Sequence, residues 1–151
     1  MKKLRLALAL VLLVLSIGFP VSAANTTDTS FSITCPDMDV TVLASSGRAK
    51  TNATSVYVNF TSSTYGMTAY GTYFVIYGGS NSSTAVANVN CNQGAGARMY
   101  GGQIRAVRTM CYENGYAYAF LGVKGYNNTT AGETVKGKWS PDSSRYYTPA
   151  N

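Results

Sequence analysis

Apolar and polar residues alternate along most of the chain after residue 23, and no segment there has the 3.6-residue period of an amphipathic helix. β-Branched and aromatic residues fill the alternating runs, and Gly, Pro, Asn and Ser separate them. The pattern predicts strands at 30–35, 39–44, 54–61, 69–78, 84–91, 103–113, 116–125 and 134–140. This number of short strands favours an all-β fold, an antiparallel two-sheet β-sandwich, over a closed barrel.

The dipeptide Asn114-Gly115 is the sharpest turn signal in the chain. Both residues tolerate positive φ, which a two-residue type I′ turn requires, so a hairpin is expected between the strands at 103–113 and 116–125. In that register one face is a core face, apart from Arg108. The other face carries Tyr116, Tyr118 and Phe120 with charged residues at its rim.

The N-terminal residues have the features of a secretory signal peptide. Lys2, Lys3 and Arg5 precede an apolar run at 6–17, and small residues at 21–23 follow it. The run is shorter than the roughly 20 residues that span a bilayer, which disfavours a membrane anchor. We expect cleavage after Ala23 or Ala24, which leaves one domain at 24–151. The mature chain, without a transmembrane segment, is then expected to be secreted, either extracellular or associated with the cell surface.

The charge balance of the mature chain is mildly basic. Three of the twelve basic residues lie in the signal peptide, so nine basic residues remain against six acidic ones. A net charge this close to zero does not indicate a nucleic-acid partner.

The sequence contains no histidine, which removes Ser-His-Asp and Cys-His catalysis and most zinc sites. Gly94-Ala95-Gly96 is a lone Gly-x-Gly in a loop and indicates flexibility. Asp37 and Asp39 could contribute to a calcium site, but a turn after Pro36 explains them more simply. No feature brings two carboxylates together as a glycosidase pair. We therefore expect a protein that is not an enzyme and holds no metal or cofactor.

The stripe of Tyr116, Tyr118 and Phe120 is the first candidate for binding. Aromatic rings stack on sugars or on an apolar partner surface at low entropic cost. A second buried sheet face has the same pattern, so core and exposed platform are both open interpretations. A basic group could meet anionic wall polymers or lipid head groups, or could be a solvated face: Arg98, Arg105, Arg108 and Lys124.

The only tryptophan, Trp139, shares one face of the last strand with Val135 and Gly137, while Lys136 and Lys138 take the other. Trp139 is therefore expected to close the core at the end of that strand. A polar tail at 140–151 follows. Its Tyr146 and Tyr147 are the second candidate for binding a partner.

Three cysteines in an exported chain suggest one disulfide. If successive strands alternate in direction, Cys35 and Cys91 end at the same edge of the sheets. Cys111 then lies near the far end of its strand, about 26 Å from Gln103 at roughly 3.3 Å per residue. A disulfide needs Cα atoms within about 7 Å. A Cys35–Cys91 bond is therefore expected, with Cys111 unpaired or linked between molecules.

The segments VKGKWSPDS, GYAYAFL and GRAKTNATSVYV resemble small secreted proteins of Gram-positive bacteria that end in a GKWSPDS-like motif. The likeness covers roughly a third of the chain, and those proteins are largely uncharacterised, so it implies no catalytic residues. Size, export and a Trp/Tyr-rich end also resemble, more distantly, the lactococcin-type bacteriocins. That resemblance implies a two-sheet β-sandwich.

Three functions are compatible with these observations. The first is a secreted, non-enzymatic β-sandwich that binds a cell-wall polymer, glycan or envelope protein at or outside the cell envelope. The second is a bacteriocin-like toxin that acts on target-cell envelopes, and the third is a structural component of the cell surface. The sequence names no ligand, target or oligomeric state.

Overall fold

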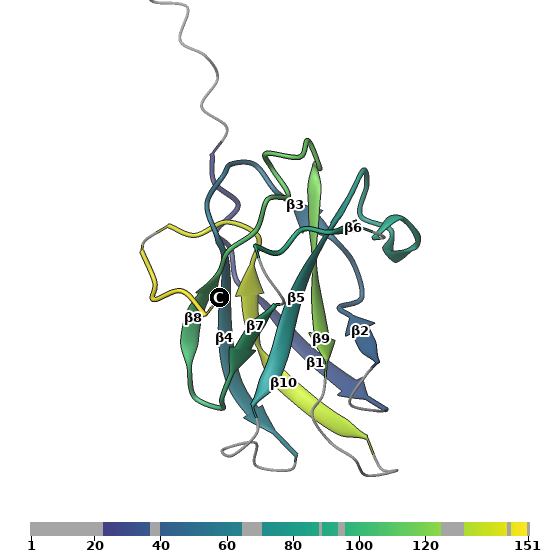
Figure 1. The fold of residues 1–151 in the computed structure, drawn as a ribbon, viewed down its shortest axis with the longest axis vertical. Helices are drawn as coiled ribbons and strands as arrows, with labels where there is room; N and C mark the ends of the chain where they lie inside the picture. The colour runs from purple at the N-terminus through teal and green to yellow at the C-terminus, as the bar shows by residue number, and fades with distance from the viewer. Residues whose placement is uncertain are drawn as a thin grey trace, which may run out of the picture.

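The computed structural model describes residues 23–36, 40–64, 71–87, 89–93, 96–124, 132–144 and 146–150. The described chain forms two antiparallel sheets, which confirms the expected all-β architecture (Figure 1). Residues 1–22 of the predicted signal peptide lie outside the described residues, as do Asp37, Asp39, Gly94 and Ala95.

The first sheet has the strand order β1-β10-β4-β8. Its strands are β1 (Thr29–Cys35), β10 (Glu133–Ser140), β4 (Val56–Ser63) and β8 (Ile104–Val107), and every neighbouring pair is antiparallel. The final long strand of the chain therefore lies between the first strand and β4, so residues from both ends of the sequence share one sheet.

The second sheet has the strand order β2-β9-β5-β6. These strands are β2 (Thr41–Leu43), β9 (Tyr118–Lys124), β5 (Thr72–Gly79) and β6 (Val89–Asn90). Two further short strands extend it: β3 (Arg48–Ala49) pairs with β9, and β7 (Ala97–Met99) pairs with β5. A single 3₁₀ turn, η1 (Thr84–Val86), precedes β6 within the described chain.

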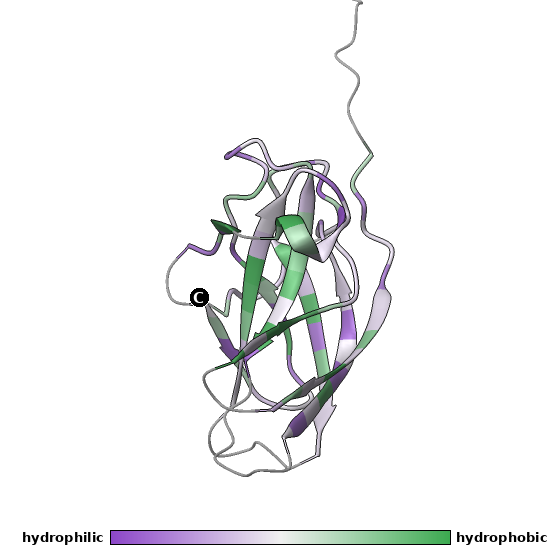
Figure 2. Cartoon of the chain, turned by 90° about the vertical axis from the view of Figure 1, so that its right-hand side faces the viewer, coloured by the Kyte–Doolittle hydropathy of each residue, from purple (hydrophilic) through white to green (hydrophobic). Residues whose placement is uncertain are grey.

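The core lies between the two sheets. Phe74 of β5 packs edge-on against Phe31 of β1 and Phe60 of β4, with ring centroids 6.1 and 5.5 Å apart. Hydrophilic and hydrophobic residues are mixed along the strands (Figure 2). Exposed and buried positions alternate in β1, which turns one set of side chains inward, whereas β9 is buried at every position except its two ends. Trp139 is 1% exposed and belongs to this core, which agrees with its expected role at the end of β10.

Gly137 shows why β10 needs a glycine beside Trp139. A Cβ at this position would lie 2.8 Å from the Phe31 ring and closer still to the backbone oxygen of Asn59 on β4. The β10–β4 register also shifts between Lys136 and Gly137. The missing side chain therefore lets β4 and the Phe31 ring approach the bulged strand closely.

The expected hairpin around Asn114-Gly115 is wrong. β8 ends at Val107 and pairs with β4 in the first sheet, whereas β9 pairs with β5 in the second sheet. Arg108, which the hairpin register would have turned toward the core, is exposed instead. The chain thus leaves one sheet at Val107 and enters the other at Tyr118, and it needs a connection longer than two residues.

Residues 110–116 supply that connection as one helical turn closed by a Schellman-type cap. The amide of Tyr116 donates to the carbonyl of Cys111, and the amide of Gly115 donates to the carbonyl of Tyr112. Gly115 has φ +79°, as the cap requires, but Asn114 is not in the positive-φ region. The sequence therefore predicted correctly that Gly115 adopts a positive φ, but the glycine caps a helical turn and does not form a two-residue hairpin.

The C-terminal tail, yellow in Figure 1, leaves β10 and returns beside β8. The amide of Ala106 donates to the carbonyl of Thr148, and the amide of Ala150 donates back to the carbonyl of Ala106. Ala106 and Pro149 form a parallel bridge. The described part of the tail therefore covers the open edge of β8.

No helix in the described chain has the length and hydrophobicity that a membrane crossing requires.

Candidate functional site

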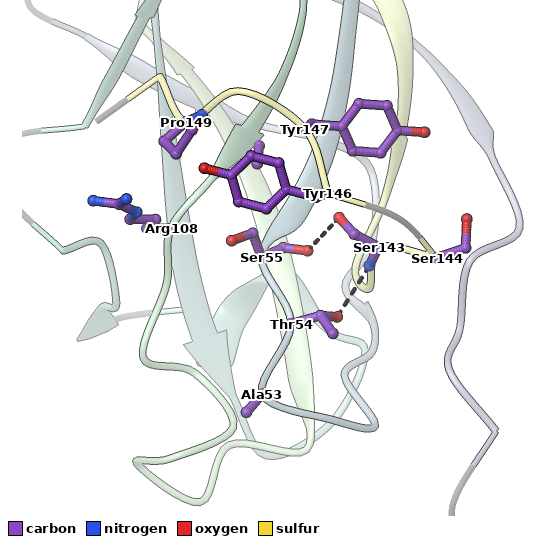
Figure 3. Close-up of a pocket in the computed structure, with 10 residues that line it drawn as sticks. Ala53, Thr54, Ser55, Arg108, Ser143, Ser144, Tyr146, Tyr147 and Pro149 are labelled. Atoms are coloured by element: carbon purple, nitrogen blue, oxygen red, sulfur yellow. Dashed lines mark hydrogen bonds between the residues drawn. The ribbon is translucent and has the colours of Figure 1, made fainter.

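The C-terminal tail and the loop before β4 enclose a hollow of about 410 Å³ (Figure 3). Hydroxyl groups, two tyrosine rings and one guanidinium group line it. The lining residues are Ala53, Thr54, Ser55, Ala106, Arg108, Ser143, Ser144, Tyr146, Tyr147 and Pro149. A neighbouring hollow of about 380 Å³ shares Ser143, Ser144 and Tyr147, so the tail forms a wall between the two hollows.

Ser143 fixes the start of the tail to the loop before β4. Its amide donates to Thr54 Oγ1 over 3.0 Å, and its hydroxyl donates to the carbonyl of Ser55 over 2.8 Å (Figure 3). Thr54 is held in turn, because its hydroxyl donates to Asn52 Oδ1. The floor of the hollow is therefore organised before any ligand arrives.

The two tyrosines differ in their surroundings. The Tyr147 ring packs on Tyr57 of β4, with centroids 4.9 Å apart. Tyr146 is 87% exposed, the largest exposed fraction among the large apolar and aromatic side chains described. A ring this exposed contributes little to the core, so it is available for contact with a ligand at the mouth of the hollow.

A buried ion pair lies just below the tail. Lys50 Nζ is 2.5 Å from Asp142 Oδ1, and both side chains are fully buried. Asp142 Oδ2 accepts hydrogen bonds from the Asn25 amide at 2.8 Å and from the Thr51 hydroxyl at 2.6 Å. This network ties the N-terminal segment, the loop after β3 and the tail together immediately before Ser143.

The same network sets the ionisation of Asp142. Burial alone would raise the pKa of this carboxyl, but the hydrogen bonds from Lys50, Thr51 and the Asn25 amide outweigh it and lower the pKa. Asp142 therefore remains a carboxylate at neutral pH and balances the buried ammonium of Lys50.

Tyr116, Tyr118 and Phe120 do not form an exposed platform. Phe120 is fully buried, and Tyr116 is half-buried against the core. Tyr118 is also half-buried, in β9 beside β3. Of the two interpretations of this stripe, a core or half-core face is the one observed.

Glycines explain how Phe120 and Tyr116 become covered. The Phe120 ring lies where a Cβ on Gly47 or Gly79 would be, within 2.4 to 2.7 Å of it, and the Tyr116 ring lies over Gly78. The segment at Gly47 therefore covers the Phe120 ring, whereas Tyr116 packs over Gly78 against the core. Alternation along β9 alone could not reveal this loop.

The basic residues do not form one patch. Arg105 and Lys124, which the predicted hairpin would have placed opposite each other, lie in different sheets. Arg98 lies over the rings of Tyr73 and Tyr100, 5.8 Å from each centroid. Arg108 alone among the four lines the candidate hollow.

The structure contains no disulfide, and all three cysteines are described and buried. Cys35 Sγ donates to the carbonyl of Val123, whereas Cys91 packs against Gly78. Val123 and Ala119, the partner of Gly78, are four residues apart on β9, or about 13 Å. The expected Cys35–Cys91 bond is absent. It assumed a fifth strand at 84–91 that carries Cys91 to the edge where Cys35 lies, but residues 84–86 form the turn η1 and Val89–Asn90 alone pair as β6.

Sequence reasoning named Tyr146, Tyr147 and, within the basic group, Arg108, but it missed the other side chains of this site. Thr54 and Ser55 are 89 and 88 positions from Ser143, and none of the three belongs to a recognisable motif. Lys50 and Asp142 are separated by 92 positions and gave no signal either. Among the described residues, no group of three or more His, Cys, Asp or Glu side chains could hold a metal ion.

Comparison with known proteins found no match among the curated proteins and none among the solved structures. One family model, described as a protein of unknown function (DUF2712), matches residues 19–143. The matched range contains the Lys50–Asp142 pair and all three cysteines, and it ends before Tyr146. Since the match covers most of its length, the chain belongs to the DUF2712 family.

Proposed function

We propose that the protein is an exported, non-enzymatic β-sandwich that binds a glycan of the cell envelope in the hollow beneath its C-terminal tail. The observation that carries the proposal is the lining of that hollow: an 87% exposed Tyr146 above a floor of serine and threonine residues. A tyrosine ring stacks on the apolar face of a sugar, and hydroxyl and backbone groups exchange hydrogen bonds with its hydroxyls.

Arg108 adds a preference for glycans that carry negative charge. Arg108 is an exposed residue that lines the same hollow. Guanidinium groups form charge-assisted hydrogen bonds with carboxylates and phosphates. The ligand class is therefore a polyhydroxylated chain with phosphate or uronic-acid groups, and its affinity should fall as salt concentration rises.

The test is a titration of purified envelope polysaccharide into the protein by isothermal calorimetry. Tyr146→Ala should weaken binding by at least about tenfold, which corresponds to loss of one stacking contact of roughly 1.4 kcal/mol. Tyr112→Ala is the matched control, because Tyr112 is 47% exposed and lies outside the hollow. The proposal fails if no polysaccharide binds, or if both variants bind like the parent.

A second comparison isolates the charge preference. Arg108→Gln should weaken binding of a phosphate-bearing or uronate-bearing polymer and leave binding of a neutral polymer unchanged. Equal losses for both polymers would contradict the role of Arg108.

The bacteriocin-like toxin and the structural surface component remain alternative predictions. Killing of indicator cells by the purified protein would favour the toxin. Concentration-dependent assembly in analytical ultracentrifugation would favour the structural component. Sequencing the N-terminus of the protein recovered from culture medium tests export and the cleavage site at Ala23 or Ala24.

A further inference from the structure

Cys91 and Cys111 are brought together by backbone pairing that the sequence did not predict. Asn92 and Thr109 form an antiparallel bridge, so Met110 faces Cys91. The amide of Met110 donates to the carbonyl of Cys91 over 2.7 Å. Cys111 is the next residue, which places its Cα about 6 Å from that of Cys91, inside the range that disulfides span.

The side chains meet as well. Thr109 Oγ1 lies 3.1 Å from the carbonyl oxygen of Cys91 and 3.2 Å from Cys111 Sγ. The two thiols also lie close enough for each to affect the pKa of the other. Cys35 is engaged elsewhere, with Val123.

We propose that Cys91 and Cys111 form a disulfide when the chain folds in an oxidising compartment. The geometry is independent of the proposed function. Only the oxidising environment depends on the proposed function, because that function requires export of the protein to an oxidising compartment.

The oxidant is the disulfide of a thiol–disulfide oxidoreductase or of a small molecule such as oxidised glutathione. One cysteine of the pair loses its proton and attacks a sulfur of that disulfide, forming a mixed disulfide and releasing one donor thiol. The second cysteine then loses its proton and displaces the remaining donor thiol. The pair gives up two electrons and two protons, and the donor disulfide becomes two thiols.

Burial indicates when this exchange takes place. Cys91 and Cys111 are 2% and 0% exposed, so the native thiols are closed to a bulky donor. Burial, reinforced by the adjacent Cys111 thiol, also raises the pKa of Cys91 to about 12, so little thiolate is present. The bond should therefore form while the chain folds, before the sheets close over the pair.

The bond would close a loop that crosses between the sheets. Between Cys91 and Cys111 the chain forms β7 on the second sheet and then β8 on the first. A loop of this size restricts the unfolded chain enough to raise the midpoint of thermal unfolding by about 10 °C.

Peptide mapping tests the pairing directly, because trypsin places each cysteine on a different peptide. Cleavage after Lys and Arg yields 24–48 with Cys35, 51–98 with Cys91 and 109–124 with Cys111 from the chain cut after Ala23. The purified chain is unfolded in reductant, refolded in a glutathione redox buffer and digested without reduction. We expect 51–98 linked to 109–124, and any link to 24–48, or no link, overturns the proposal.

Two variants complete the test. Cys35→Ser should keep both the link and the redox-dependent rise in unfolding temperature, whereas Cys111→Ser should lose both. If Cys111→Ser does not fold, the mapping of the parent chain still decides the pairing. No ligand is present in this experiment, so its outcome is separate from that of the glycan titration.

Discussion

At the residue scale, the Lys50–Asp142 pair is the clearest single contact on which the stability of the fold should depend. Both charges are fully buried, and Asp142 accepts hydrogen bonds from three different residues. A buried pair adds little beyond an apolar replacement, but loss of one partner leaves the other charge without compensation. Breaking the pair should therefore destabilise the fold, including the tail that begins at Ser143.

Asp142→Asn should lower the free energy of unfolding by roughly 3–5 kcal/mol, because Lys50 then remains buried without a counter-charge. Urea unfolding of the parent and the variant measures the change. The double variant Lys50→Met/Asp142→Leu should recover much of the loss. A double variant as unstable as the single one would contradict this electrostatic explanation.

The lowered pKa of Asp142 predicts how stability depends on acid. A carboxyl whose pKa is lower in the folded state than in the unfolded state stabilises the fold above the unfolded value of about 3.9. That contribution is lost as pH falls from there through the folded pKa. Unfolding curves at successive pH values below about 5 should therefore show a steeper loss of stability for the parent than for Asp142→Asn.

Gly137 predicts a second residue-level effect. Gly137→Ala would place a Cβ against the Asn59 backbone oxygen and the Phe31 ring, so overpacking should cost about 1–3 kcal/mol or more. Gly101→Ala is the matched control, because the nearest atom to its Cβ, the Thr61 oxygen, is 3.8 Å away. Equal unfolding midpoints for the two variants would show that β10 and β4 separate easily.

At the element scale, the sequence predicted best the strands whose alternation is long and uninterrupted. The expected segments 30–35 and 134–140 match β1 and β10 within one residue at each end. The segment 84–91 failed, because its first residues form η1 and only Val89–Asn90 pair as β6. The segment 103–113 failed because alternation continues past Val107 although the chain there leaves the first sheet.

Gly115 tests the turn that replaces the predicted hairpin. Gly115→Val should cost about 1–2 kcal/mol, because a β-branched residue resists the observed φ of +79°. Since nothing lies within 4 Å of the added Cβ, the cost is one of backbone conformation alone. Gly115→Asn should cost clearly less, because Asn tolerates the left-handed region. Equal thermal midpoints for the two variants would contradict the cap.

At the scale of the whole molecule, the candidate site depends on segments that meet only after folding. The loop at 53–55, Arg108 and the tail from Ser143 come from three regions of the sequence. Composition could indicate Tyr146 and Tyr147 but not the residues beside them in the folded chain. No local sequence pattern predicts that the tail returns to the edge of β8. A separate bridge, between Asn92 and Thr109, brings Cys111 to Cys91, which strand counting placed apart.

The most direct test of the central claim is an amide NMR titration of the ¹⁵N-labelled mature chain with a fragment of a phosphate-bearing or uronate-bearing envelope glycan. If the hollow beneath the tail is the binding site, shifts should concentrate at Thr54, Ser55, Ser143 and Tyr146 and should saturate. Shifts that concentrate on another face, or a spectrum that stays unchanged at millimolar glycan, would contradict the account.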